Sequence, residues 1–129
     1  MTIAFIDTSV LIHLYRQHPE ALLWFNGQET QLSVSSITWL EFMDGAPSKT
    51  GQTLCLSILS KFELIRLSDS DQDWAMQQIK DYRLSRGVHP DDCLIASTCH
   101  RLQVPIYTQN VKDTRKLLPE TLVKRPFVA

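Results

Sequence analysis

Residues 2–14, Thr-Ile-Ala-Phe-Ile-Asp-Thr-Ser-Val-Leu-Ile-His-Leu, indicate the fold class because the spacing of the apolar residues changes within them. Thr2–Ile6 is a short apolar run, typical of a buried strand, and it ends at Asp7. Across Thr8–Arg16 the apolar residues recur instead at helical spacing. This stretch therefore predicts a buried strand that leads directly into a helix, with an acidic residue between them.

The rest of the chain continues this alternation, and glycine, proline and capping residues separate the segments. A turn rich in glycine, proline and serine is expected at Gly45–Gly51. The alternation predicts an α/β domain with a mainly parallel sheet of four to five strands. The further expected strands are Gln31–Ser35, Phe62–Leu67, Val104–Tyr107 and Thr121–Lys124. The further expected helices are Pro19–Asn26, Thr38–Asp44, Thr53–Lys61, Pro90–Arg101 and Val111–Leu118. A long helix is also expected, capped within 68–71 and ending near Ser85.

With 129 residues, the chain is expected to form a single domain over residues 1–129, because two domains would each lack a sufficient core. No apolar run approaches the roughly 18–20 residues that span a bilayer, so no membrane association is expected. The N-terminus has neither a basic region nor a small-residue cleavage site, which predicts a cytoplasmic protein. The cysteines, Cys55, Cys93 and Cys99, form no closely spaced pair and favour buried thiols over disulfides or a zinc site.

Charge is distributed unevenly along the chain, although its net value is only −1. Residues 1–60 carry two basic and five acidic side chains, whereas residues 101–129 carry six basic and two acidic ones. This segregation would place a basic rim beside an acidic centre, which suits a polyanionic substrate. An ordinary solvated surface explains the same charges equally well, so the pattern alone does not decide between the two.

Four acidic residues are placed where such a fold can gather them. Asp7 follows the first strand, and Asp113 follows the fourth. Glu41 lies in the helix after the second strand, and Asp92 lies in the first turn of the helix that begins at residue 90. In parallel sheets, ligands bind beyond the carboxyl ends of the strands. Clustered carboxylates repel one another, and a divalent cation such as Mg²⁺ removes that cost, activates water and stabilises charge on a phosphoryl oxygen. The pattern therefore indicates phosphodiester hydrolysis.

Each of these acids also has an ordinary structural explanation. Glu41 is explained by a solvent-exposed helix face, Asp92 by the helix dipole and Asp113 by helix capping. Asp7 is the hardest to explain in this way, because a strand end followed by an apolar helix does not require an acid. The case for a shared site therefore depends on the joint placement of the four residues.

Four segments carry a more specific signal than any single acid. They are Ile6–Ile12 (IDTSVLI), Ser36–Gly45 (SITWLEFMDG), Pro90–Ala96 (PDDCLIA) and Tyr107–Asp113 (YTQNVKD). In this order, and spread over nearly the whole chain, they resemble the PIN domains, specifically the VapC-type toxin ribonucleases of bacterial toxin–antitoxin pairs.

The resemblance implies a three-layer α/β/α sandwich that cleaves RNA endonucleolytically with Mg²⁺ or Mn²⁺. It also implies homodimerisation and a cognate VapB-like antitoxin that covers the site. Thr108 and Asn110 match polar positions that orient a carboxylate or water. By the same similarity Asp7, Asp92 and Asp113 would bind the metal. The acidic constellation of the family is matched by Asp7, Glu41, Asp92 and Asp113.

Two positions need separate consideration. Thr114 stands where many relatives have an aromatic residue after the last acid, Asp113. Asp91 precedes Asp92, so the helix offers two carboxylates. The spacing to residues 94–96 assigns the metal ligand to Asp92 and leaves Asp91 as a helix-start residue.

The resulting hypothesis assigns a role to each acid. Asp7 and Asp92 hold one ion, Asp113 completes or bridges its site, and water activated by the metal attacks the phosphorus. Glu41 positions a water molecule or a second ion. Basic residues would hold the RNA backbone with salt-dependent affinity, and selectivity would come from RNA shape or unpaired bases. The candidates are Lys112, Arg115, Lys116, Lys124 and Arg125.

Two alternatives compete with this hypothesis. An enzyme that forms an aspartyl phosphate in the manner of haloacid dehalogenases would need an acid at position 9, where Ser9 stands. A catalytically silent PIN-like RNA- or protein-binding module would keep the fold without the chemistry, and the presence of all four acids counts against it.

The aromatic residues Trp24, Trp39, Trp74 and Tyr82 are expected in the core or a dimer interface rather than as platforms for stacked bases. Two apolar segments, Ile37–Met43 and Thr53–Leu59, are candidates for a self-complementary dimer surface.

Overall fold

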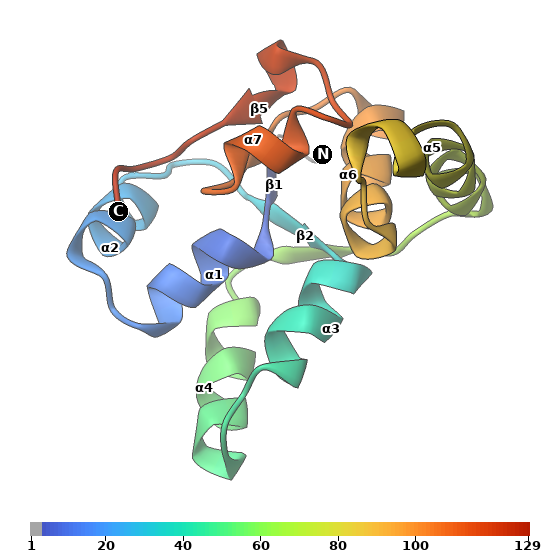
Figure 1. Ribbon diagram of the computed structural model, residues 1–129. Coiled ribbons are helices and arrows are strands. Elements are labelled where there is room, and N and C mark those ends of the chain that lie inside the picture. Colours follow the sequence, from blue (N-terminus) through green and yellow to red (C-terminus); the bar gives the residue numbers. More distant parts are fainter. Residues whose placement is uncertain (1–3) are drawn as a thin grey trace.

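The computed structural model describes residues 4–129 and contains a five-stranded sheet with helices on both faces (Figure 1). All four strand pairs are parallel, in the order β3-β2-β1-β4-β5. This confirms the predicted three-layer α/β/α sandwich and its parallel sheet. Thr2 and Ile3 of the predicted first strand lie outside the described residues.

The strands are β1 (Phe5–Ile6), β2 (Ser33–Ser35), β3 (Glu63–Ile65), β4 (Ile106–Tyr107) and β5 (Val123–Lys124). The helices are α1 (Thr8–Tyr15), α2 (Pro19–Asn26), α3 (Ser36–Asp44), α4 (Lys49–Leu59), α5 (Asp69–Arg86), α6 (Pro90–Leu102), α7 (Val111–Thr114) and a 3₁₀ helix (Glu120–Leu122).

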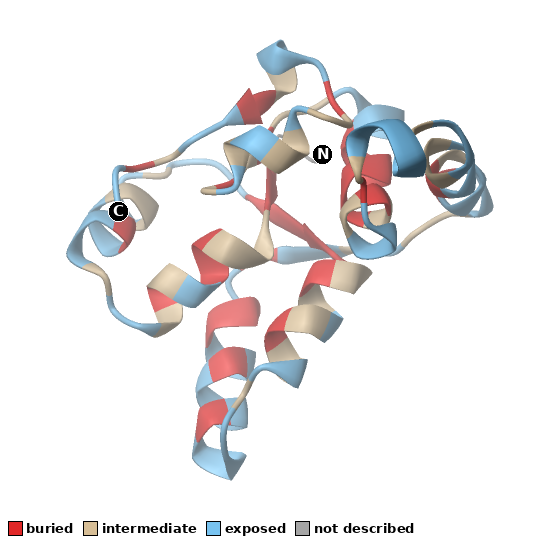
Figure 2. Ribbon diagram, viewed as in Figure 1, coloured by how far each residue is buried: buried red, intermediate tan, exposed pale blue. Residues whose placement is uncertain are grey.

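Successive side chains of β1 point to opposite faces of the sheet and enter two different cores. Ile6 packs in one core with Val10 of α1, whereas Phe5 packs in the other with Cys99 of α6 and Ile106 of β4. Figure 2 shows the result, with β1 and β2 buried and the outer faces of the surrounding helices exposed. The apolar run at the start of the chain is therefore buried on both sides, as a central parallel strand requires.

The start of α4 differs from the prediction. The helix begins at Lys49 instead of Thr53, so Gly51 lies inside it rather than in the preceding turn. The hydroxyl of Ser48 accepts a 3.0 Å hydrogen bond from the N–H of Gly51 and caps the helix. A serine cap outweighs the low helix propensity of one glycine.

The helix predicted at Val111–Leu118 is also shorter than expected, because α7 ends at Thr114. Beyond it, the N–H of Lys116 donates to the carbonyl of Asp113 at 3.1 Å, and the N–H of Leu117 donates to that of Thr114 at 3.0 Å. These bonds join residues three apart, whereas the N–H of Leu118 reaches the carbonyl of Thr114 four residues back, so an irregular turn replaces the regular helix.

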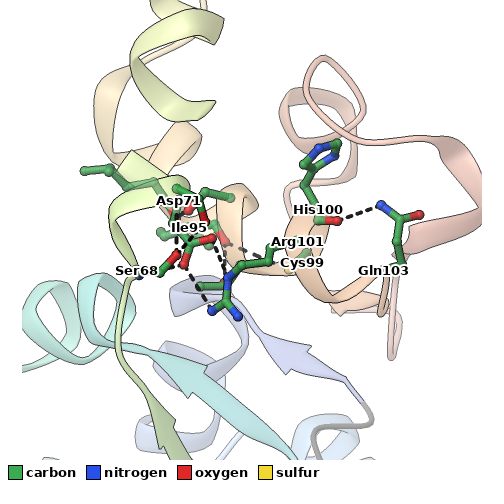
Figure 3. A network of polar contacts seen from close by, with 11 residues as sticks. Ser68, Asp71, Ile95, Cys99, His100, Arg101 and Gln103 are labelled. Atoms are coloured by element: carbon green, nitrogen blue, oxygen red, sulfur yellow. Dashed lines mark hydrogen bonds and ion pairs between the residues drawn. The ribbon is translucent and has the colours of Figure 1, made fainter. Parts of the chain in front are cut away.

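An ion pair between a buried carboxylate and a partly exposed arginine joins α5 to α6 (Figure 3). Ser68 caps α5, and Asp71 completes the capping box by accepting the N–H of Ser68. Asp71 is 1% exposed and also accepts hydrogen bonds of 2.8 and 3.2 Å from Arg101 of α6. Burial alone would raise the pKa of Asp71, but the hydrogen bonds from Arg101 and Ser68 lower it. The pair therefore holds an ionised carboxylate between the two helices, and α6 is anchored to α5.

The C-terminal segment leaves β5 and crosses to α2 (Figure 1). Phe127 is buried, and its ring lies against those of His13, His18 and Trp24. Trp24 also packs edge-on against Tyr107 of β4, with ring centroids 5.0 Å apart. The aromatic residues at this end of the molecule therefore pack on the sheet.

Cys55, Cys93 and Cys99 are buried and form no disulfide within residues 4–129, as predicted. None of the helices in the described chain combines the length and the apolar character that crossing a membrane requires.

Candidate active site

The strand order reverses between β1 and β4. The chain proceeds from β1 to β2 and β3 on one side, whereas β4 and β5 lie on the other. In open α/β sheets, ligand sites form at such a switch point, beyond the carboxyl ends of the strands. Asp7 follows β1 and Thr108 follows β4, and the pairing of Ile6 with Tyr107 sets them side by side.

Two hydroxyl groups hold the carboxylate of Asp7. Ser9 Oγ and Thr108 Oγ1 each donate a 2.8 Å hydrogen bond to Asp7 Oδ2. Both hydroxyls are held in turn by the backbone, because the N–H of Gln109 donates to Ser9 and that of Asn110 donates to Thr108. No side-chain hydrogen bond within the described chain reaches Asp7 Oδ1. One oxygen of the carboxylate is thus bound by the protein, and the other is left for a ligand.

Asp92, in the first turn of α6, shares a small cavity with Asp7. The cavity has a volume of about 20 Å³, enough for a water molecule or an ion. Burial raises the pKa of Asp92, and the negative charges of Asp91 and Asp7 raise it further. A cation in the cavity would relieve this repulsion. The remaining residues that line it are Ile95, Ala96, Ile106, Asn110, Thr114 and Leu117.

Glu41, on α3, does not line this cavity but lines a different pocket with Thr8, and it lies beside Asp91. Thr8 Oγ1 donates a 2.6 Å hydrogen bond to Glu41 Oε1, and the carboxyl groups of Glu41 and Asp91 share a hydrogen bond. Burial, followed by the hydrogen bond with Asp91, raises the pKa of Glu41 to about 7. The same hydrogen bond lowers the pKa of Asp91. At mildly acidic pH the pair therefore holds one proton, mainly on Glu41, and Glu41 ionises as the pH passes about 7. Asp91 is in the first turn of α6 as predicted, but it is also a partner of Glu41.

Asp113, on α7, is not among the residues that line the cavity. Its Oδ1 lies 3.0 Å from Nζ of Lys116, and its side chain is 45% exposed. Hydrogen bonds from Lys116 and Asn110 lower the pKa of Asp113. Its negative charge nevertheless contributes to the raised pKa of Asp92. The structure thus brings Asp7 and Asp92 together and leaves Asp113 at the margin of the site.

The arrangement fits a hard divalent cation that is held by few protein ligands. Within residues 4–129, no three acidic, histidine or cysteine side chains converge tightly enough to enclose an ion. Mg²⁺, however, is usually bound through one or two carboxylates and keeps waters or substrate phosphates as its other ligands. Asp7 and Asp92 present two carboxylates to one cavity. The residues therefore fit Mg²⁺ or Mn²⁺ in an open site rather than an ion caged by protein.

Sequence reasoning named Thr108 but missed Thr8 and Ser9, which hold Glu41 and Asp7. The position of Ser9 offered a signal, because a serine two residues after Asp7, in the first turn of a helix, can turn back toward the strand end. The partnership between Thr8 and Glu41 offered none, because it depends on the packing of α1 against α3.

The parallel α/β/α sandwich and the acidic residues at its switch point are those expected of a PIN domain. The family model of the PIN domain matches residues 4–112, so the chain belongs to the PIN domain family. A comparison with curated protein sequences finds no match.

The chain is similar to solved toxin–antitoxin structures over nearly its whole length. A chain of a toxin–antitoxin complex from Klebsiella pneumoniae is 26% identical, with 98% of this chain and 99% of that chain covered and a TM-score of 0.79. A chain of DNA-bound VapBC from Salmonella typhimurium is 22% identical, with 97% and 98% covered and a TM-score of 0.78. VapC20 of Mycobacterium tuberculosis, a sarcin–ricin loop cleaving toxin, is 11% identical, with 91% and 97% covered and a TM-score of 0.73. The last two are likenesses of fold alone.

Proposed function

We propose that this protein is a Mg²⁺- or Mn²⁺-dependent endoribonuclease, the toxin of a VapBC-like toxin–antitoxin pair, acting in the cytoplasm as one domain over residues 1–129. The observation that carries the proposal is that Asp7 and Asp92 line one cavity at the switch point of a PIN-family sheet. The similarity to the K. pneumoniae toxin–antitoxin chain supports the biological context. The acids at the site and the basic residues beside it favour a polyanion as the substrate.

A bound divalent cation would supply a polarised water and positive charge beside the scissile phosphate. Asp7 and Asp92 would hold it, and Asp7 would use Oδ1, because Ser9 and Thr108 already occupy Oδ2. These two hydroxyls keep the carboxylate in one orientation, as partners behind a metal ligand commonly do. Asn110 lines the same cavity and supports Thr108 through its backbone N–H.

Glu41 would act as the general acid–base group that exchanges a proton with the attacking water. A pKa of about 7 allows it to accept or return a proton near neutral pH, which is the range in which general acid–base catalysis works best. The hydrogen bond from Thr8 fixes Oε1, and Asp91 shares the proton. These contacts give Glu41 a defined position and a partner for the proton.

Basic residues beside the site would hold the RNA backbone, and their affinity would fall as salt rises. Arg125 Nη2 lies 3.5 Å from the carbonyl of Gln109, whose N–H supports Ser9, so this cation stands close to the acidic centre. The proposed phosphate contacts are Lys112, Arg115, Lys116, Lys124 and Arg125. A VapB-like antitoxin is proposed to cover this acidic centre, and a second copy of the chain is proposed as a partner in a homodimer.

Replacing Asp7 with asparagine tests the proposed function. D7N keeps the size of the side chain but removes the charge that would bind the ion, so single-turnover RNA cleavage in Mn²⁺ should fall roughly 100-fold or more. Glu29→Gln is the matched control, because Glu29 is exposed in the loop before β2, at the opposite end of the sheet. D7N activity equal to that of the wild type would overturn the mechanism. RNA binding without cleavage by the wild type would instead favour the silent binding module.

A further inference from the structure

The basic residues proposed to bind RNA differ in their present partners. Lys116 pairs with Asp113, with 3.0 Å between Nζ and Oδ1, and Arg115 pairs with Glu120 at 3.3 Å. Lys112 belongs to none of the ion pairs in residues 4–129. Lys116 therefore already holds a carboxylate, and a phosphate would compete with Asp113 for its ammonium group.

The backbone of Lys116 is fixed, whereas its side chain has room to change partners. Its N–H donates to the carbonyl of Asp113, and its own carbonyl accepts a 3.1 Å hydrogen bond from Arg86 of α5. The Lys116 side chain is 33% exposed. A move of the ammonium group therefore requires no movement of the chain.

Asp113 acts electrostatically on Asp92 but does not line the metal cavity. Asn110 and Thr114, on either side of it in the chain, line the cavity with Asp7 and Asp92, whereas Asp113 does not. The amide of Asn110 also hydrogen-bonds to the carboxylate of Asp113. The carboxylate thus stands next to the cavity, held there by Lys116 and Asn110.

We propose that Lys116 is a positioning residue that holds Asp113 away from the Asp7–Asp92 cavity until an RNA phosphate binds Lys116 and releases Asp113 toward the ion. This inference rests on the proposed function and adds a coupling to it. A partly exposed lysine–carboxylate pair contributes little stability, so the exchange of carboxylate for phosphate costs little. The released carboxylate is then attracted by the cation. Because coupling is reciprocal, RNA tightens metal binding and the metal tightens RNA binding.

Calorimetric titration with Mn²⁺ alone tests the first half of the inference without any cleavage assay. Lys116→Met should bind Mn²⁺ roughly fivefold more tightly than the wild type, because Asp113 is no longer held. Lys112→Met removes the same charge from the same segment but no ion pair, and it measures the effect of charge alone. In an Asp113→Asn background, Lys116→Met should change the affinity no more than Lys112→Met does. Equal effects of the two lysine variants in the parent chain would overturn the inference.

The second half is tested with the oligonucleotide dT10, which lacks the 2′-hydroxyl groups of RNA, as the source of phosphate. Saturating dT10 should tighten Mn²⁺ binding by the wild type more than by Lys116→Met, because only the wild type has a held carboxylate to release. An equal gain in both proteins would overturn the coupling. The two proposals fail differently: if Mn²⁺ binds equally to the wild type and to D7N, the proposed metal site is wrong. If binding needs Asp7 but ignores Lys116, only this inference is wrong.

Discussion

At the scale of single residues, the direction of two hydroxyl protons decides how Asp7 is held. Ser9 Oγ accepts the N–H of Gln109, and Thr108 Oγ1 accepts that of Asn110. Each hydroxyl has one proton, and both protons are left to point at Asp7 Oδ2. The backbone amides after β4 therefore set the orientation of a carboxylate at the end of β1. This residue-level arrangement leaves one oxygen of Asp7 facing a ligand.

Glu41 predicts a pH dependence of stability in the metal-free protein. Its pKa is raised from an ordinary value near 4.5 to about 7. Ionising Glu41 therefore costs more free energy in the folded protein than in the unfolded chain, and folding stability falls as the pH rises between these values. The stability contributed by the protonated group is present below about pH 4.5 and is lost as the pH passes 7. Glu41→Gln should therefore raise the melting temperature by about 3 °C at pH 8 and have little effect at pH 4.5.

Scanning calorimetry in EDTA at the two pH values measures this difference. Glutamine can still accept the hydrogen bond from Thr8 and donate one to Asp91, so the substitution removes the charge with little loss of contacts. Glu29→Gln, at an exposed position, should show no such difference between the two pH values. A Glu41→Gln effect of the same size at both pH values would contradict the prediction.

At the scale of elements, the contact between α5 and α6 depends on Asp71. Asp71→Ala removes the hydrogen bonds to Arg101 and half of the capping box, so the free energy of unfolding should fall by about 2–3 kcal/mol. Urea denaturation measures the change. Asp69→Asn, an exposed residue in the same helical turn, should cost only about 0.5 kcal/mol through the helix dipole. Similar losses in the two variants would show that the ion pair between Asp71 and Arg101 adds no stability of its own.

For Gly51 in α4, packing and helix propensity predict stability changes of opposite sign when the glycine is replaced by alanine. Propensity alone would make Gly51→Ala stabilising by about 1 kcal/mol. A Cβ atom there would, however, lie 2.8 Å from Cδ of Pro47 and 2.9 Å from the hydroxyl oxygen of Tyr15. Relief of that overlap should reverse the sign and make the variant less stable by about 1–2 kcal/mol in urea denaturation. Gln52→Ala, at the exposed next position, should be stabilising by a few tenths of a kcal/mol, and a stabilising Gly51→Ala would contradict the packing argument.

The elements also show what could be predicted from the sequence. Helix α2 was predicted at its observed bounds, because Pro19 begins it and Gly27 ends it. For α5, a cap within 68–71 and an end near Ser85 were predicted, and the helix, capped by Ser68, runs from Asp69 to Arg86. The start of α4 was missed because Gly51 looks like a turn residue until its packing against Tyr15 is known. Local signals therefore predicted the ends of α2 and α5, but they missed the start of α3 at Ser36 and the end of α7 at Thr114.

At the scale of the whole molecule, the order of strands and helices was enough to predict a shared acidic site, but not the partners of each acid. Asp7 and Asp92 were expected at one edge of the sheet, and they line one cavity there. The pairing of Asp113 with Lys116 and the contact of Glu41 with Asp91 depend on side-chain directions across different elements. Such contacts produce no periodic pattern in the sequence. The position of the site was therefore predictable, but the ion-pair and hydrogen-bond partners of its acids were not.

The proposed homodimer makes a prediction at this largest scale. Leu40 is 57% exposed and, with Trp39 of α3 and Leu64 of β3, lines a groove of about 230 Å³. Strand β3 is an edge of the sheet, so this apolar surface adjoins unpaired backbone and is a natural place for a second copy. Leu40→Glu should weaken the dimer roughly 30-fold or more in analytical ultracentrifugation, because a charge would be buried at the centre of the contact. Leu23→Glu, on α2, is the matched control, because Leu23 is more exposed, at 73%, and lies outside the groove. If both variants sediment as the wild-type dimer does, the two copies meet through another surface. If the wild type is a monomer, the proposed homodimer is wrong.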